Sequence, residues 1–281
     1  MTPKKTLNIA GNILELDETK VMGVVNVTPD SFYAGSRTAD PKDALEQVAN
    51  MLAEGATFID VGGYSSRPGA DDISEAEELQ RTIPVIEALN KEFPQALISI
   101  DTFRSTVARA AVHSGASLIN DISGGHLDQN MLSTVAELKV PYIGMHMKGT
   151  PQTMKSLTAY DDLLMEMMRY FGSLKEACLE RGIHDLILDP GFGFAKTIEQ
   201  NYYLLNHYPV FKQIGCPVLV GISRKSMIYK TLRVEPADAL NGTTVLNTIA
   251  LMKGVDILRV HDVKEAVEAV SLVKKFDDSR V

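Results

Sequence analysis

The sequence predicts an α/β fold, a (β/α)8 TIM barrel that is preceded by a short N-terminal β-hairpin. Eight short apolar runs alternate with segments of helical periodicity, which is typical of a parallel sheet covered by helices. The length of 281 residues suits a single domain spanning residues 1–281. An open doubly wound sheet has the same alternation. The count of eight strands and the lack of a GxGxxG motif after the first of them favour the barrel.

Most of the predicted strands are continuous apolar runs, as expected for strands that are covered on both faces. They occupy residues 21–27, 57–61, 97–100, 117–119, 140–145, 185–188, 217–221 and 256–260. The helices between them are predicted from apolar residues that recur at a spacing of three or four. They occupy residues 42–54, 75–93, 106–113, 130–138, 160–180, 199–213, 237–252 and 263–276. Five of these helices are followed by a glycine that can adopt the left-handed backbone of a helix end: Gly55, Gly115, Gly182, Gly215 and Gly254.

Residues 6–16 differ from the rest of the chain. Leu7 and Ile9 precede Gly11-Asn12, and further apolar residues follow, which predicts a small hairpin around a Gly-Asn turn. In a barrel this hairpin could cover the bottom opening.

Composition excludes several classes of partner. The formal net charge is −8, which argues against duplex nucleic acid and anionic membranes as partners. No apolar run approaches the ~18 residues of a membrane span, and no signal-peptide core follows Lys4 and Lys5, so we expect a cytoplasmic protein. Cys178 and Cys216 lie far apart without metal-ligand spacing and are expected to be reduced thiols.

Polar residues gather where the apolar runs end. A single polar residue there is usually a helix cap, but this explanation fits all eight ends poorly, because Arg, Lys and His are not preferred caps. Parallel strands would bring the ends to the carboxyl face, where barrel enzymes keep their sites. The residues concerned are Asn26, Asp60, Asp101, Asn120, His146, Asp189, Ser223 to Ser226, Arg259, His261 and Asp262.

Two of these ends predict an anion site. Arg259 and His261 are two apart on a strand and therefore point to the same side, and Asp262 is expected to cap the next helix. Ser223 to Ser226 add hydroxyls and cations after the seventh strand, a usual phosphate location in these barrels. The alternative is a solvated basic turn, which suits Arg224 better than Lys225. A phosphorylated substrate is the favoured interpretation.

Three residues from different strands, Asp101, Asn120 and Asp189, could converge inside the barrel mouth. They could serve as acid and base, as metal ligands, or as partners of a donor-rich heterocycle. The residues themselves leave all three alternatives open. The loops at 28–38 and 62–72 are rich in Gly, Ser and Pro, and they are expected either to close over a ligand or to be ordinary surface connections.

Seven segments, in this order, closely resemble the dihydropteroate synthase family. They are GVVNVTPDSF at 23–32, DVGGYSSRPGA at 60–70, SIDTFR at 99–104, INDIS at 119–123, DPGFGFAK at 189–196, GISRKSMI at 221–228 and RVHDV at 259–263. The resemblance implies the TIM barrel and a Mg²⁺-dependent, S_N1-like condensation in folate biosynthesis. The family joins 6-hydroxymethyl-7,8-dihydropterin diphosphate to 4-aminobenzoate and releases 7,8-dihydropteroate and diphosphate. A homodimer and sulfonamide sensitivity are also typical of this family.

Site roles follow from the resemblance, motif by motif. The positions that match the pterin pocket are Asp101, Asn120, Met145, Asp189, Gly221 and Lys225. Those that match the diphosphate site are Asn26, Arg67, Arg259 and His261, with Asn26 linked to the metal. Those around the aminobenzoate are Phe32, Ser66, Arg67, Pro68, Phe194 and Ser226. Catalysis is assigned to Asp101, Lys225, Arg259 and His261.

The sequence departs from the common family pattern at three positions. Tyr64 occupies a position that is often Glu, Ser66 one that is often Thr, and Ala195 one that is often Gly. Ser66 keeps the hydroxyl, Tyr64 removes a charge that could affect loop closure, and Ala195 is expected to be a minor change. The rival interpretations are a pterin-binding methyltransferase, which has no diphosphate to hold, and a non-catalytic pterin-binding paralogue.

Overall fold

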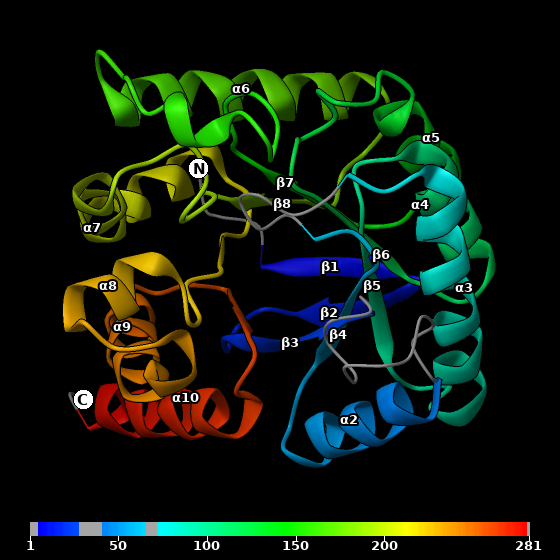
Figure 1. Ribbon diagram of the computed structural model, residues 1–281, viewed down its shortest axis with the longest axis horizontal. Coiled ribbons are helices and arrows are strands. Elements are labelled where there is room, and N and C mark those ends of the chain that lie inside the picture. Colours follow the sequence, from blue (N-terminus) through cyan, green and yellow to red (C-terminus); the bar gives the residue numbers. More distant parts are fainter. Residues whose placement is uncertain (1–4, 28–40, 66–71, 280–281) are drawn as a thin grey trace.

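Eight parallel strands form a closed barrel in the computed structural model, which describes residues 5–27, 41–65 and 72–279. The strands follow one another in the order β8-β7-β6-β5-β4-β3-β10-β9. A parallel bridge between Leu188 and Val218 joins the two ends of this order and closes the sheet. Figure 1 shows the helices surrounding the strands. The predicted (β/α)8 TIM barrel is confirmed.

The strands are short, and each lies within two residues of a predicted apolar run. They are β3 (Lys20–Asn26), β4 (Phe58–Gly62), β5 (Leu97–Asp101), β6 (Leu118–Asp121), β7 (Tyr142–Met145), β8 (Leu186–Asp189), β9 (Leu219–Val220) and β10 (Ile257–Val260). Nearly all their residues are buried, because helices cover the outside and side chains fill the inside. The continuous apolar pattern of these runs has this physical origin.

The helices lie outside the sheet, with their apolar faces against it. They are α2 (Pro41–Ala53), α3 (Glu75–Glu92), α4 (Ser105–His113), α5 (Met131–Leu138), α6 (Leu163–Glu180), α7 (Ile198–His207), α8 (Ser226–Leu232), α9 (Leu240–Met252) and α10 (Val263–Asp278). Short 3-10 helices occupy Met154–Ser156, Tyr208–Ile214 and Pro236–Asp238. The five glycines expected at helix ends all have positive φ, from 77° to 120°.

Two helix predictions need correction. The predicted helix over 199–213 is α7 followed by a separate 3-10 turn that begins at Tyr208, where Pro209 is in the first turn. Helix α8 was missing from the prediction. It has only seven residues and two buried apolar side chains, Met227 and Ile228, so it has too little periodicity to be detected.

The N-terminal hairpin closes the amino end of the barrel. Strands β1 (Thr6–Ile9) and β2 (Asn12–Glu15) pair antiparallel, as predicted. The turn lies one residue earlier than expected, at Ala10-Gly11, and both residues have positive φ. The hairpin and the residue that follows it pack on the first layer of the barrel interior. That cluster contains Leu7, Ile9, Leu16, Met22, Phe58, Leu118, Ile143, Ile187, Leu219 and Ile257.

In the described part of the chain, no helix combines the length and the apolar character that crossing a membrane requires. Cys178 and Cys216 are both buried and unbridged. Burial raises the pKa of the Cys178 thiol to about 12, so this side chain is an inert core thiol.

Candidate active site

Arg259 and three other polar side chains meet inside the carboxyl end of the barrel. The Nε of Arg259 donates to Asp60 Oδ2 at 2.7 Å, and its Nη2 donates to Asp101 Oδ2 at 2.6 Å. The amide of Asn120 donates to the same Asp60 oxygen at 2.9 Å. These residues come from β10, β4, β5 and β6, and the register places Asp101 directly beside Asn120. We call this group the Arg259 cluster.

The Arg259 cluster is electrostatically unusual because its charges are removed from water. Burial raises the pKa of Asp101 to about 7, even though the positive charge of Arg259 acts to lower it. The neighbouring carboxylate of Asp60 raises it further. Asp60 is completely buried, and its Oδ1 has no hydrogen-bond partner among the described residues. The cluster therefore holds acceptor capacity that the described protein does not use.

A second group lies at the ends of β8 and β9. The ammonium of Lys225 donates to the carbonyl of Phe192 at 2.6 Å and lies 4.8 Å from the centre of the Phe194 ring. Asp189 is buried and accepts from the backbone N–H of Gly191 at 2.8 Å. Burial lowers the pKa of Lys225 to about 8, and the charge of Asp189 opposes this shift.

The two groups act on each other through their charges. Burial raises the pKa of Asp189, whereas Lys225 and then Arg259 lower it. Lys225 in turn responds to Arg259 and Asp101. The structure therefore brings Asp101, Asn120 and Asp189 to one polar region, as the sequence predicted.

Two further predicted residues border this region. Met145 is buried at the end of β7, in register with Asp189, and it packs in a small cluster that includes Phe194. Gly221 follows β9 beside β10, where an added Cβ would lie 3.7 Å from the Cβ of Arg259. Both positions suit a flat ligand that approaches the Arg259 cluster.

The predicted anion residues lie at the outer edge of the same end. His261 is exposed, and its Nδ1 is 3.0 Å from the hydroxyl of Ser223. Ser226 is half-buried at the first position of α8, directly after Lys225. Asn26 is half-buried at the end of β3.

Two expectations about the anion site are wrong. Asp262 makes no side-chain cap to α10. Its carboxylate instead accepts from Arg224 Nε at 2.9 Å and from Arg224 Nη2 at 2.7 Å. Arg224 also donates to the carbonyls of Pro236 and Ala237, so it is neither a solvated cation nor an anion ligand. A two-point pair with a carboxylate across the loop satisfies both charges better than a helix cap does.

Three structurally important residues have no site role predicted from the sequence. Asp60 joins the Arg259 cluster, and its position at a strand end was the available signal. Lys196 and His146 are both buried, and Lys196 Nζ lies 3.2 Å from His146 Nδ1. Nothing in their spacing along the sequence predicts this contact, because it depends on how the loop after β8 folds onto the end of β7.

Tyr64, the departure from the family pattern, is nearly buried after β4. Its hydroxyl accepts from Gln152 Nε2 at 2.7 Å, and its ring meets Phe103 edge-on at a centroid distance of 5.0 Å. The guanidinium of Arg104 lies 5.4 Å from the ring centre. A glutamate could not make these ring contacts, which hold Tyr64 itself against Phe103 and Arg104. The predicted site residues Phe32, Ser66, Arg67 and Pro68 lie outside the described residues.

Magnesium is implied only by the family resemblance. Within the ranges 5–27, 41–65 and 72–279, no three His, Cys, Asp or Glu side chains are grouped as a metal site. Asn26 offers one amide oxygen, a ligand type that Mg²⁺ accepts when water and substrate phosphates supply the rest. The donor set therefore fits a metal carried largely by a phosphorylated substrate.

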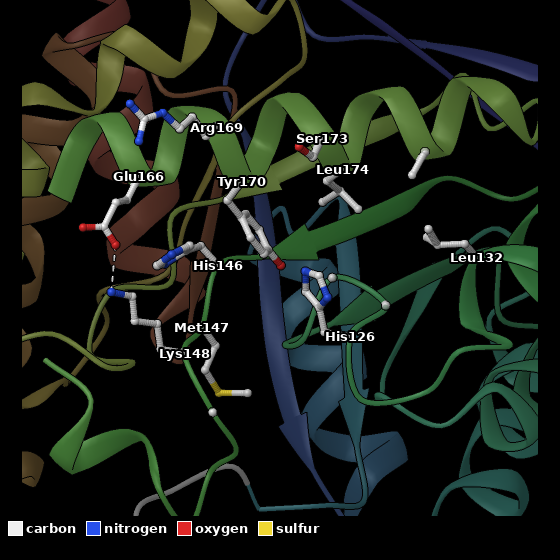
Figure 2. A pocket seen from close by; sticks show the side chains of 14 residues that line it. His126, Leu132, His146, Met147, Lys148, Glu166, Arg169, Tyr170, Ser173 and Leu174 are labelled. Carbon is white, nitrogen blue, oxygen red and sulfur yellow. Dashed lines mark hydrogen bonds and ion pairs between the residues drawn. The ribbon is translucent and has the colours of Figure 1, made fainter. Parts of the chain in front are cut away.

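A separate cavity of about 730 Å³ lies outside the barrel mouth, between α6 and the loops that follow β6 and β7 (Figure 2). Lys148 and Glu166 form an ion pair of 2.8 Å on its wall. His146 borders this cavity and also contacts Lys196. It therefore connects the cavity wall to the loop after β8.

Comparison with known proteins agrees with the geometry. The family described as "Pterin binding enzyme" matches residues 22–261. The chain is 46% identical over 264 residues to the dihydropteroate synthase of Synechocystis sp., covering 93% of this chain and 90% of that protein. It is 45% identical over 266 residues to the Escherichia coli K12 enzyme, covering 94% of each.

Solved structures of dihydropteroate synthases also resemble this chain. Dihydropteroate synthase of Yersinia pestis, solved in a sulfonamide drug complex, superposes with a TM-score of 0.91 at 42% identity and covers 98% of this chain and 99% of that chain. The Xanthomonas albilineans enzyme, solved with 4-aminobenzoic acid, has a TM-score of 0.90 at 39% identity and covers 97% and 98%. The chain therefore belongs to the dihydropteroate synthase family of pterin-binding enzymes, a family of transferases.

Proposed function

We propose that this enzyme joins 6-hydroxymethyl-7,8-dihydropterin diphosphate to 4-aminobenzoate, with Mg²⁺, and releases 7,8-dihydropteroate and diphosphate. The observation that carries the proposal is that hydrogen-bond acceptors and basic side chains lie close together at the barrel mouth. Asp101, Asn120 and Asp189 lie in one electrostatically coupled region with Lys225 and Arg259. This combination suits a donor-rich ring that bears a charged leaving group.

The pterin is proposed to lie between the Arg259 cluster and Lys225. Its ring N–H groups are donors, and the carboxylate of Asp189 and the amide of Asn120 provide acceptors in a buried setting. Hydrogen bonds to a charged group are worth roughly 1.5–3 kcal/mol each. Met145 and Gly221 provide the packing surface and the space for a flat ring.

The diphosphate is proposed to bind where Arg259, His261 and Asn26 face the open end of the barrel, together with Arg67. A guanidinium has five N–H donors. Arg259 uses Nε and Nη2 on Asp60 and Asp101, which fixes its plane and leaves donors for phosphate oxygens. Mg²⁺ bound through Asn26 and the substrate would neutralise charge on the leaving diphosphate.

The aminobenzoate is proposed to lie beside Phe194 and Ser226, with Phe32, Ser66, Arg67 and Pro68 completing its site. Phe194 is nearly buried against Lys225, at the boundary between the two proposed substrates. The relative that was solved with 4-aminobenzoic acid supports this part of the proposal. Sulfonamides are expected to compete with this substrate.

The reaction is proposed to be dissociative. The bond between the pterin methylene and the diphosphate oxygen breaks first, and the electron-rich ring stabilises the cation. The aniline nitrogen then attacks the methylene and loses a proton. The protein positions both substrates, supplies fixed positive charge for the leaving group and excludes water. No covalent nucleophile is needed. A homodimer and a cytoplasmic location complete the proposal and rest on the family resemblance.

The test is product formation by the purified chain with both substrates and Mg²⁺. Asp189→Asn and Lys225→Met should each lower kcat/KM for the pterin diphosphate by about 10- to 100-fold, the equivalent of one lost charged hydrogen bond. Glu137→Gln, which alters an exposed ion pair with Arg109, should leave the rate unchanged. Absence of dihydropteroate with folded wild-type protein would contradict the proposal.

A further inference from the structure

The loop between β8 and α7 has a backbone that needs outside support. Gly191 and Gly193 have φ of 68° and 83°, and Ala195 has φ of 48°. A left-handed conformation at an L-residue costs roughly 1–2 kcal/mol, so surrounding contacts must hold Ala195 in place. The loop also approaches β7 closely, because an added Cβ on Gly191 would lie 2.2 Å from the carbonyl oxygen of His146.

Lys196 ties this loop together from inside. Its ammonium donates to the carbonyls of Gly191 and Phe194, both at 3.0 Å, and it lies 3.2 Å from Nδ1 of His146. An ammonium has three N–H donors, and these contacts account for all three. Lys196 is only 8% exposed. It is therefore a buried basic group, with a pKa that burial lowers to about 7, and its hydrogen bonds all go to protein.

His146 is suited to be the third acceptor. Burial, together with the charge of Lys196, lowers the pKa of His146 to about 2, so the ring is neutral. Nδ1 can then accept from the ammonium. Figure 2 shows His146 beneath α6 with Tyr170 beside it, and the two rings meet edge-on at a centroid distance of 4.9 Å. The histidine therefore anchors Lys196 to a well-packed part of the barrel.

The loop that Lys196 holds presents three groups to the proposed substrates. The carbonyl of Phe192 accepts from Lys225, the ring of Phe194 lies under the same ammonium, and the N–H of Gly191 donates to Asp189. A shift of the loop would move all of these contacts together. Lys196 itself has no donor left for a substrate.

We propose that Lys196 is a positioning residue for the synthase reaction, which acts by holding the loop of residues 190–195 so that Phe194 and Lys225 are placed for both substrates. The inference rests on the proposed function. It differs from a general structural role because its effect must pass through the side chains that the loop presents.

The test is a double-mutant cycle between Lys196→Met and Phe194→Ala, measured by kcat/KM for 4-aminobenzoate. Methionine keeps the length and apolar volume of the side chain but has no donors. Lys196→Met should lower kcat/KM at least tenfold in the wild-type background. In the Phe194→Ala background the loss in kcat/KM should be at least threefold smaller, because one of the two side chains that the loop places is gone. Effects that multiply, or an unchanged rate in the single variant, would overturn the proposal.

Lys253→Met is the matched control. Lys253 also donates to two oxygens of one neighbour, the carbonyl and the side chain of Asn206, at 3.0 Å each, but it is only half-buried and directly follows the outer helix α9. It should leave kcat/KM unchanged. If Lys196→Met does not fold, His146→Leu replaces it in the cycle, since it removes one acceptor and keeps the two carbonyl bonds. It should lower kcat/KM at least threefold, and the loss should again be smaller in the Phe194→Ala background.

The wild-type rate distinguishes failure of the proposed function from failure of the proposed role of Lys196. If the wild-type protein makes no dihydropteroate, the proposed function fails, and the role of Lys196 fails with it. If the wild-type protein is active and the cycle is multiplicative, only the role of Lys196 is contradicted.

Discussion

At the residue scale, the barrel mouth is a balanced set of buried charges. Asp60, Asp101 and Asp189 face Arg259, Lys225 and Lys196, three carboxyl groups against three basic groups. Burial lowers the pKa of Lys196 to about 7, and Asp189 opposes this shift. The described site therefore has no large excess of positive charge, so the proposed binding of diphosphate would depend on directed donors and on further cations.

His146→Gln tests the buried histidine through pH. An unfolded imidazole has a pKa of about 6.5, whereas the folded protein lowers it to about 2. Between these values only the unfolded state binds the proton. The contribution of His146 to stability is therefore complete above pH 6.5 and is lost as the pH falls. Below pH 6 the free energy of unfolding should fall more steeply in wild type than in His146→Gln, by roughly 1.4 kcal/mol per pH unit.

The measurement is urea unfolding of wild type and His146→Gln at about pH 7, 6 and 5, which gives the free energy of unfolding at each pH. Glutamine keeps an acceptor for Lys196 but does not titrate. The buried carboxyl groups, whose raised pKa values give the opposite slope, are present in both proteins and cancel in the comparison. Parallel pH dependence of the two proteins would show that His146 is protonated in the folded state.

Ala195→Gly should stabilise the protein, contrary to the expectation that this departure from the family pattern is minor. Ala195 has φ of 48°, which glycine adopts without strain. The gain should be about 0.5–1 kcal/mol in the free energy of unfolding, because relief of roughly 1–2 kcal/mol is partly offset by the flexibility of unfolded glycine. Ala177→Gly, within α6, should lower stability by about 0.5–1 kcal/mol. An equal loss in the free energy of unfolding in both variants would show that the backbone at Ala195 is not strained.

At the element scale, we expect the N-terminal hairpin to contribute to stability and the strand-end loops to contribute to function. The hairpin packs on the amino end of the barrel interior, whereas the candidate site occupies the carboxyl end. Substitutions in the hairpin should therefore affect folding, and substitutions at the carboxyl end should affect the reaction.

Leu7→Ala tests the hairpin. Leu7 is completely buried in the apolar cluster at the amino end of the barrel interior, so its truncation should lower the free energy of unfolding by about 2–5 kcal/mol. Ile13→Ala, on the next strand, should change it by less than about 0.5 kcal/mol, because Ile13 is 63% exposed. Urea unfolding measures both. The folded fraction of Leu7→Ala should keep the wild-type kcat, and a large loss of kcat would show that the hairpin influences the distant site.

Most elements could be predicted because barrel strands leave a strong signal. A strand buried on both faces, such as β7, is apolar throughout, and the α-helix that follows it is amphipathic. The short helix α8 and the turn at Ala10-Gly11 could not be placed, since each is decided by a few backbone angles and local contacts. The strand ends could be located, and with them Asp101, Asn120 and Asp189.

Side-chain partners were harder to predict than positions. The pair of Arg224 with Asp262 and the pair of Arg259 with Asp60 join residues 38 and 199 positions apart in the chain. Their formation depends on strand register and on competition among several acceptors. Lys196 was equally hidden, because the loop after β8 must first fold before its carbonyls reach the ammonium.

At the scale of the whole molecule, closure of the sheet is what makes a single site from eight strand ends. Strands β8 and β9 meet through the bridge at Leu188, and this places Asp189 and Lys225 on one side of the opening. The net charge of −8 describes the whole surface and says little about this opening. It is compatible with an anionic small molecule because charges are paired locally.

Binding of the pterin diphosphate at this opening can be measured by calorimetric titration. The titration uses 6-hydroxymethyl-7,8-dihydropterin diphosphate with Mg²⁺, wild-type protein and Asp189→Asn. We expect one site per chain in wild type and at least tenfold weaker binding in the variant. Equal affinity of the two proteins, or no binding by folded wild type, would contradict this expectation.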